Sequence, residues 1–347
     1  MTKYIAAGSL SLLLLGAIWL KGCTLSTDIS PQQSQPTKKP IELIPVAERY
    51  EHGRYDFTDV AILESGEMLA VGYDGQDPRR MWHSTDGGST WLRVPISSSG
   101  FIINAIDFIG SQHGWAVGGY GTIMTTSDGG RTWKQMYRPT RAALEKVAFV
   151  NLKFGYVAGS IGTYDKNTDT RTFGIEILKT SDGGQTWHSC YKDNTSGTVW
   201  QIATLSEMVA LVLVDGNRVL RTIDGGKKWH EVLFKLRGPQ SVIFTKAGVG
   251  WMVGEKLFYK SNDKGLTWRT PQGIPCSLLE HDWSAIDFAD ENVGMAVSED
   301  SAIALTKDGG QTWFDIAPNP GEELRWIRLQ GQTGIVLGSQ RVFRVKM

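Results

Sequence analysis

The chain has 347 residues, with 36 basic and 36 acidic side chains and a formal net charge of zero. This balance, with no lysine- or arginine-rich stretch beyond the Lys38–Lys39 pair, excludes the basic footprint of a protein that binds nucleic acid. The 41% of hydrophobic residues, 13 Trp and 40 Gly, beside only 21% of charged residues, are typical of an all-β protein with many turns.

The N-terminal segment has the features of a targeting sequence. An apolar run from Ile5 to Leu20 is followed closely by Cys23. We therefore predict a lipoprotein-type signal over residues 1–23, with Cys23 lipidated, and a flexible tether over residues 24–40. Because Lys21 departs from the small or apolar residue usual before such a cysteine, an uncleaved membrane anchor and ordinary cleavage with release stay open as alternatives. The first two interpretations place the rest of the chain outside the cytoplasm, tied to a membrane.

One eight-residue pattern, Ser/Thr-x-Asp-x-Gly-x-Thr-Trp, occurs six times, and we call each copy an Asp box. Asp can accept hydrogen bonds from backbone N–H groups further along the turn, Gly supplies the positive φ of a tight reversal, and Trp packs beneath it. We predict a hairpin at each copy and a structural role for its aspartate. Lys228 replaces Thr in the fourth box, and Lys264 replaces the first Gly in the fifth. The box aspartates are Asp86, Asp128, Asp182, Asp224, Asp263 and Asp308.

Short β-rich segments precede each box, such as Ala105 to Phe108 and Gly114 to Gly118, and successive box aspartates lie 39 to 54 residues apart. Four-stranded units of about 40 residues are typical of β-propeller blades. Leu324 to Val345 hold three more strands after the last box. We therefore predict an all-β, seven-bladed β-propeller over residues 41–347, closed by an N-terminal strand from Ile41 to Val46. A six-bladed ring with an irregular C-terminal end is the alternative.

The Asp boxes, joined to a strand of the form Gly-aromatic-x-Val-Gly and its variants, resemble the photosystem II stability/assembly factor family. This strand motif occurs at Gly114 to Gly118, Gly155 to Gly159 and Gly250 to Gly254. The resemblance covers residues 41–347 and implies a non-enzymatic scaffold, without a cofactor, that binds an assembly intermediate of a membrane-protein complex. It places the propeller in the periplasm, or in the thylakoid lumen of a photosynthetic organism, and we expect a monomer. Non-photosynthetic relatives share these features, so another envelope protein stays open as the client.

The face opposite the boxes is the predicted partner-binding surface, because loops carry function on a rigid scaffold. The resemblance implies a basic patch for client binding there. The candidate residues are Arg79, Arg80, Arg138, Arg141, Arg237 and Tyr164, with Tyr137 beside them. The competing interpretation is solvated loop charge, which nearby aspartates, such as Asp74 and Asp165, neutralise.

Sialidases share the Asp box, so a glycan-binding or sialidase-like glycosidase propeller is the second functional hypothesis. Such an enzyme needs an arginine cluster for the substrate carboxylate, a tyrosine nucleophile with a glutamate partner, and a carboxylic acid. The sequence has no Arg-Ile-Pro segment near the first blade and no recognisable catalytic constellation. We therefore predict no catalytic residues and no enzyme activity.

The third blade carries an insertion at residues 162–174, where Asp165, Asn167, Asp169 and Glu176 match ligand positions of a calcium loop. Thr170 stands where that template requires Gly, so we predict no metal site and keep calcium or partner binding there as alternatives. Cys190 and Cys276 fall in blades that are not adjacent, too far apart for a disulfide bond, and we predict free thiols.

Overall fold

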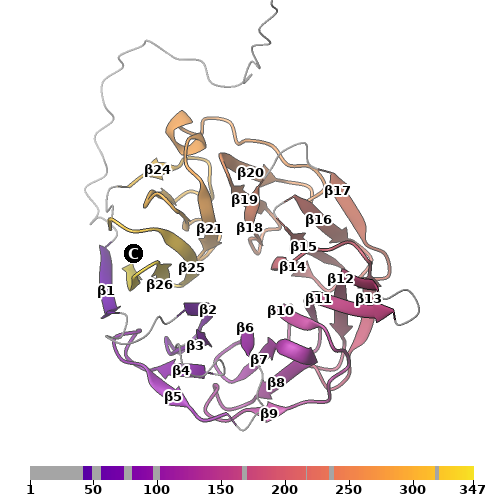
Figure 1. Cartoon of the computed structure of the whole chain (residues 1–347). Helices are drawn as coiled ribbons and strands as arrows, with labels where there is room; N and C mark the ends of the chain where they lie inside the picture. The colour runs from indigo at the N-terminus through magenta and orange to yellow at the C-terminus, as the bar shows by residue number, and fades with distance from the viewer. Residues whose placement is uncertain are drawn as a thin grey trace, which may run out of the picture. The chain divides into compact units, whose positions relative to one another are not determined.

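The computed structural model describes residues 42–48, 56–73, 80–96, 102–165, 170–215, 217–233, 238–316 and 320–347. Seven antiparallel sheets form a ring around a central channel (Figure 1). The predicted seven-bladed β-propeller is confirmed. The six-bladed alternative is wrong, because the last three strands of the chain form a complete sheet with the first described strand.

The blades follow one another in chain order, each starting at the channel and ending at the rim (Figure 1). The first three blades are β2 (Asp56–Ile62), β3 (Met68–Tyr73), β4 (Arg80–Ser84) and β5 (Leu92–Val94); β6 (Ile103–Ile109), β7 (His113–Gly118), β8 (Thr122–Thr126) and β9 (Lys134–Gln135); and β10 (Ala143–Phe149), β11 (Gly155–Asp165), β12 (Thr170–Thr180) and β13 (His188–Lys192). The next three are β14 (Val199–Ser206), β15 (Val209–Val214), β16 (Arg218–Thr222) and β17 (His230–Leu233); β18 (Pro239–Phe244), β19 (Gly250–Gly254) and β20 (Leu257–Ser261); and β21 (Trp283–Phe288), β22 (Gly294–Ser298), β23 (Ile303–Thr306) and β24 (Phe314–Asp315). The seventh is β25 (Leu324–Gln330), β26 (Thr333–Gly338), β27 (Arg341–Lys346) and β1 (Glu42–Glu48), and two short 3-10 helices are η1 (Gly119–Gly121) and η2 (Cys276–Leu279).

The seventh blade combines the two ends of the described chain. β1 pairs antiparallel with β27, with Leu43 opposite Val345, and so supplies the outermost strand of a sheet whose other strands lie near the C-terminus. This pairing covers an edge that β27 would otherwise expose. The fifth blade has three strands, and two backbone hydrogen bonds between Lys260 and Arg269, of 2.9 and 3.0 Å, stand in for its fourth.

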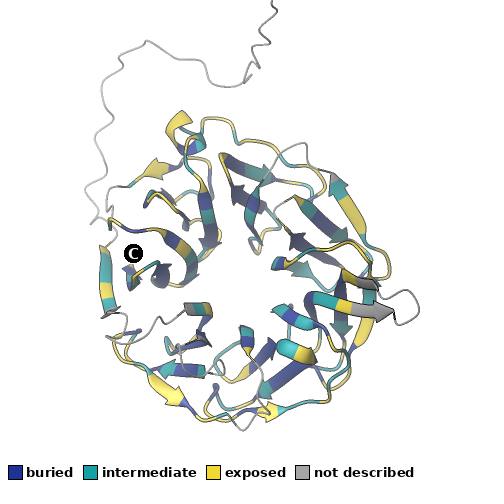
Figure 2. Cartoon of the chain, viewed as in Figure 1, coloured by how far each residue is buried: buried dark blue, intermediate teal, exposed yellow. Residues whose placement is uncertain are grey.

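Burial follows the position of a strand within its blade. The second strands β15, β19 and β22 are buried along their whole length, because each sheet packs face to face between two neighbours. Both residues of the rim strand β24 are exposed. Figure 2 shows this gradient from buried inner strands to exposed rim strands.

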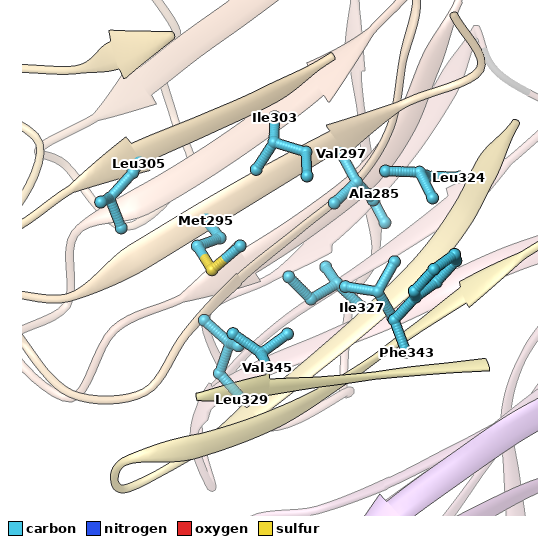
Figure 3. Close-up of a cluster of buried hydrophobic side chains, with 11 residues drawn as sticks. Ala285, Met295, Val297, Ile303, Leu305, Leu324, Ile327, Leu329, Phe343 and Val345 are labelled. Atoms are coloured by element: carbon cyan, nitrogen blue, oxygen red, sulfur yellow. The ribbon is translucent and has the colours of Figure 1, made fainter. Parts of the chain in front are cut away.

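Hydrophobic side chains fill the space between neighbouring blades. Between the sixth and seventh blades, Met295 and Ile303 pack in one cluster with Ile327 and Phe343 (Figure 3). Burying a side chain of this size contributes about 1.5–3 kcal/mol. Because such side chains lie between neighbouring blades, the core is distributed around the ring rather than gathered at one centre.

The Asp boxes take part in this packing between blades. Trp115 of β7 reaches beneath the box of the third blade, where its indole N–H donates to the Gly183 carbonyl at 2.9 Å and its ring stacks on Phe149 at 3.5 Å. A Cβ added at Gly184 of that box would lie 3.1 Å from the same indole nitrogen. Each box therefore seats a side chain from the second strand of the preceding blade. The other pairs are Leu69 and Gly130, Tyr156 and Gly226, Leu211 and Gly265, Trp251 and Gly310, and Ile335 and Gly88.

The Gly-aromatic strand motif has a steric origin. A Cβ added at Gly114 would lie 2.5 Å from the Phe108 ring, which packs flat against the strand. A Cβ added at Gly118 would lie 1.9 Å from the Ile102 carbonyl oxygen, next to an irregularity in the pairing of β6 with β7. The two glycines of the motif thus allow the first strand of the blade to approach the second closely.

The two cysteines in the described part of the chain differ. Cys190 on β13 is a free cysteine, as predicted, and burial raises the pKa of its thiol to about 11. Cys276 in η2 is disulfide-bonded, so the prediction of a free thiol is wrong there. The distance argument excluded only a bridge between these two cysteines. Within the described residues, no helix is long and apolar enough to cross a membrane.

Candidate partner-binding face and central channel

The box aspartates accept hydrogen bonds within their own turns. Asp182 accepts hydrogen bonds from the Thr186 N–H at 2.9 Å, the Thr186 hydroxyl at 2.5 Å and the Thr180 hydroxyl at 2.8 Å. Burial alone would raise the pKa of Asp182, but these bonds lower it to about 2. The same three bonds recur in the boxes of Asp86, Asp128, Asp263 and Asp308.

The opposite face carries the hairpins between second and third strands and the connections from blade to blade. Arg80 begins β4, at such a hairpin in the first blade. Arg138 and Arg141 lie in the connection from β9 to β10, between the second and third blades. The structure thus places these three predicted residues on one face, at adjacent blades. Arg79, Arg237, Cys23 and the side chain of Tyr164 lie outside the described residues.

Two exposed tyrosines accompany these arginines. The exposed fraction is 84% for Tyr137 and 64% for Tyr120. Tyr120 has φ 55° and ψ 40°, a left-handed conformation that costs a residue with a Cβ about 1–2 kcal/mol. Sequence reasoning noted Tyr137 but missed Tyr120, for which the only signal was its position between two glycines at a hairpin.

Hydrogen bonds hold this surface in place. The Gly121 N–H donates to the Ala142 carbonyl at 2.7 Å, which joins the Tyr120 hairpin to the connection that carries the arginines. With its amide oriented to satisfy its neighbours, Gln135 accepts hydrogen bonds from Arg138 Nε at 3.1 Å and Nη2 at 2.8 Å. Aromatic rings and guanidinium groups suit a segment of another protein that carries carboxylates and apolar side chains.

A cavity of about 490 Å³ occupies the central channel. Its wall consists mainly of the first strands of the third to seventh blades, with Asp59 from β2 and Asp107 from β6. Trp200, Arg325 and Trp326 also line it.

The channel wall contains hydrogen bonds that join successive blades. The Phe149 N–H donates to Asp107 Oδ2 at 2.6 Å, and the Leu329 N–H donates to Asp287 Oδ2 at 2.7 Å. In each case the carboxylate belongs to the inner strand of one blade and the N–H to that of the next. The same arrangement joins Asp59 to Ile106, Glu145 to Val199, Gln201 to Val242, and Ser241 to Ile286. We call these six acceptors the channel staples.

The seventh inner strand, β25, brings a positive charge to the channel. Burial alone would lower the pKa of Arg328, but the carboxylates of Asp287, Asp59 and Asp107 raise it on balance. Burial raises the pKa of Asp107 to about 6 and also raises that of Asp287. The staples were not predicted, although the repeated Ala-Ile-Asp-Phe runs at 105–108 and 285–288 carried the signal.

The channel does not reproduce a sialidase site. Two arginines, Arg325 and Arg328, line this cavity, but no tyrosine or glutamate does. The nucleophile and its partner are therefore missing from its wall. In the described part of the chain, no group of three or more His, Cys, Asp or Glu could hold a metal ion.

The hairpin of the insertion separates two residues of the calcium-loop template. β11 and β12 form one long hairpin, in which Asp165 pairs with Thr170 and Glu176 with Gly159. Asp165 and Glu176 therefore lie six steps apart along the ladder, about 20 Å. Glu176 is also buried, and it accepts a hydrogen bond from the Thr140 hydroxyl at 2.5 Å.

Comparisons with known proteins agree with this architecture. Residues 93–168 match the family model described as Photosynthesis system II assembly factor YCF48. The chain is 25% identical over 322 residues to the Photosystem II assembly lipoprotein Ycf48 of Synechococcus sp. (strain CC9902), covering 89% of this chain and 86% of that protein.

Solved structures share the fold at lower identity. A structure of YCF48 bound to D1 peptide has a TM-score of 0.67 and 17% identity, covering 89% of this chain and 97% of that one. A virginiamycin B lyase from Staphylococcus aureus has a TM-score of 0.62 and 12% identity, covering 89% and 99%. The fold alone therefore does not separate a scaffold from an enzyme. The family match and the similarity along nearly the whole chain agree with the resemblance predicted from the Asp boxes: the chain is similar to the photosystem II stability/assembly factors.

Proposed function

We propose that the chain is a non-enzymatic assembly factor that binds a segment of a membrane-protein assembly intermediate. Its similarity to an assembly lipoprotein over 89% of its length supports this role. A protein of similar fold has been solved with a D1 peptide, which supports a peptide segment as the bound element. Among the described residues, no tyrosine or glutamate lines the cavity in the channel, which argues against the glycosidase hypothesis.

The binding site that we propose is the surface formed by Tyr120, Tyr137, Arg138 and Arg141. The observation that carries this assignment is that all four residues lie within 93–168, the segment that the family model matches. Tyr120 adds a second argument, because its exposed ring lies at the hairpin that is hydrogen-bonded to the connection carrying the arginines. Arg80, and Arg79 beside it in sequence, would extend the surface onto the first blade.

We also propose that the protein acts as a monomer held at a membrane, with its propeller in the periplasm or the thylakoid lumen. The lipoprotein-type signal with Cys23 supports this location, as does the name of the lipoprotein to which the chain is similar. Mass spectrometry of the membrane-extracted protein would test the anchor. A mature N-terminus at Cys23 carrying acyl chains is the expected result, and a Cys23 without acyl chains, whether its thiol is free or in a disulfide bond, would refute it.

Affinity capture of the full-length protein from solubilised membranes tests the function, and binding of a D1 peptide by fluorescence anisotropy tests the site. We expect a membrane-protein partner in the capture. Replacing Arg79, Arg80, Arg138 and Arg141 by Gln should weaken peptide binding at least tenfold, through the loss of charge-assisted hydrogen bonds. Capture of no membrane protein would refute the assembly role.

Two variants control this test. Arg269→Gln removes an exposed arginine from the fifth blade and should leave binding unchanged. Tyr120→Gly removes the ring but suits the left-handed backbone, so it should weaken binding without loss of thermal stability. If the quadruple arginine variant binds as well as the wild type, the patch is not the site.

A further inference from the structure

The face that carries the Asp boxes is electrostatically uneven around the ring. At this end, the third to fifth blades carry five exposed lysines: Lys153, Lys227, Lys228, Lys246 and Lys264. The first blade carries the exposed carboxylate of Glu64 there, and the sixth blade carries Asp290 and Glu291 beside a single exposed lysine, Lys307. We call the box-side turns of the third, fourth and fifth blades the basic sector.

Apolar side chains stand among these lysines. The exposed fractions are 48% for Leu152, 50% for Met208, 54% for Ile223 and 57% for Leu266. Four such residues on neighbouring turns are more than the isolated exposed apolar side chains that any surface carries.

Hydrogen bonds between turns make the sector continuous. Asn151 Nδ2 donates to Glu207 Oε1 at 2.9 Å, which joins the third blade to the fourth. Lys179 Nζ donates to the carbonyl of Gly225, in the fourth box, at 2.7 Å. Arg221 Nε donates to the Lys264 carbonyl at 2.9 Å, which joins the fourth blade to the fifth. The acidic groups within the sector are thus engaged locally: Glu207 by Asn151, and the box aspartates by their own turns.

Two of the lysines replace residues of the Asp-box pattern that would stabilise the turn. In five boxes the threonine just before the tryptophan donates its hydroxyl to the aspartate. At this position of the fourth box, Lys228 offers Asp224 only its backbone N–H, at 2.9 Å. Lys264 has φ 59° at a position where the other boxes have glycine. Each lysine therefore replaces a residue that would favour the fold, and both replacements fall in the basic sector. Residues kept at a cost in stability are typical of functional surfaces.

We propose that the basic sector docks onto the surface of an anionic lipid bilayer. Clustered lysines attract anionic headgroups, and the exposed apolar side chains between them can enter the interface between headgroups and acyl chains. The chain before β1 adds to the argument, since a predicted tether of residues 24–40 would keep the propeller within about 60 Å of the membrane that holds the predicted anchor. This contact lies on the face opposite the proposed client site, which it would leave open to a partner.

The test compares two dye positions at the same place in neighbouring boxes. Leu266→Cys lies in the fifth box, and Gln311→Cys lies at the equivalent position of the sixth, outside the basic sector. Each full-length variant carries an environment-sensitive dye and is reconstituted into vesicles of phosphatidylcholine, with or without phosphatidylglycerol. Wild-type protein treated with the same dye shows how much of the signal comes from the native cysteines. We expect the dye at 266 to move to a less polar environment only when phosphatidylglycerol is present, and the dye at 311 not to respond.

Restoring the repeat provides the decisive variant. Lys228→Thr with Lys264→Gly, in the Leu266→Cys background, should lower the ratio of docked to undocked propeller about fivefold for each lysine lost. The thermal unfolding midpoint should stay the same or rise. An unchanged dye response in this variant, or a response that does not depend on phosphatidylglycerol, would overturn the proposal. If the sector instead binds an acidic protein, the vesicles will produce no response, which also overturns it. Because the vesicles contain no client, failure here is independent of the proposed assembly function.

Discussion

The channel staple Asp107 offers the sharpest test of how the ring is held together. Its Oδ2 accepts the Phe149 N–H at 2.6 Å, and burial raises its pKa to about 6 from an ordinary value of 3.8. Asp107→Asn keeps an oxygen that can accept this hydrogen bond but removes the charge. We expect the variant to fold, and to differ from wild type in how its stability depends on pH.

The sign and size of the effect follow from the two pKa values. A carboxyl whose pKa is raised in the folded state binds more protons there than in the unfolded chain, so its contribution to stability is lost as the pH rises through about 4 to 6. At about 1.36 kcal/mol per pH unit, that window corresponds to about 3 kcal/mol. Near pH 4 the two proteins should be about equally stable. Above pH 7 Asp107→Asn should be more stable, by an amount that approaches this value.

Urea unfolding followed by tryptophan fluorescence between pH 4 and 8 would measure the difference. Subtracting the variant curve from the wild-type curve cancels the contributions of other titrating groups. Asp107→Ala should cost about 1–3 kcal/mol even at pH 4, because it leaves the Phe149 N–H without its acceptor. Asp315→Asn, at an exposed position of β24, should change stability by less than about 0.5 kcal/mol throughout. Parallel curves for wild type and Asp107→Asn would refute the reasoning.

Three further outcomes are expected. Gly118→Ala places a Cβ 1.9 Å from a backbone carbonyl oxygen and should cost more than about 3 kcal/mol by thermal unfolding, whereas Gly162→Ala, whose nearest neighbour would lie at 3.4 Å, should be tolerated. Asp182→Ala should destabilise the protein more than Asp224→Ala, since Asp182 accepts the Thr186 hydroxyl, which Lys228 replaces in the fourth box; equal losses would contradict this. The Cys190 thiol, with its pKa of about 11, should react with iodoacetamide only on unfolding, and fast labelling of the native protein would show that it is accessible.

The fold could be predicted from the sequence because the repeat encodes local chemistry. A turn that needs aspartate, glycine and tryptophan at fixed spacing leaves the same letters each time, as in the box from Thr180 to Trp187. Six of the blades followed from these copies. The seventh blade needed more, because it has no box and was predicted from the three segments after Leu324.

The contacts between blades were harder to predict, because they join residues 41 to 54 positions apart whose side chains differ. Asp107, Glu145, Gln201 and Ser241 all accept a backbone N–H from the next blade, although they share no residue type. Only geometry shows that a carboxylate, an amide and a hydroxyl serve the same purpose. The conformation of Tyr120 was hidden for a similar reason, since the sequence Gly-Tyr-Gly does not reveal that the tyrosine, together with Gly121, adopts the left-handed backbone.

Departures from the repeat are therefore more informative about function than the repeat itself. Where the sequence follows the Asp-box pattern, each residue has a structural partner, as the bonds of Asp182 show. Lys228 and Lys264 break that pattern on one face, and Tyr120 adopts a backbone better suited to glycine on the other. Each of these residues is less favourable for the fold than the threonine or glycine that could replace it. The residues that depart from the repeat differ between the two faces. This difference fits two contacts: a lipid bilayer at the face that carries the Asp boxes, and a protein client at the opposite face. The substitutions Lys228→Thr, Lys264→Gly and Tyr120→Gly would separate these contacts from the stability of the ring.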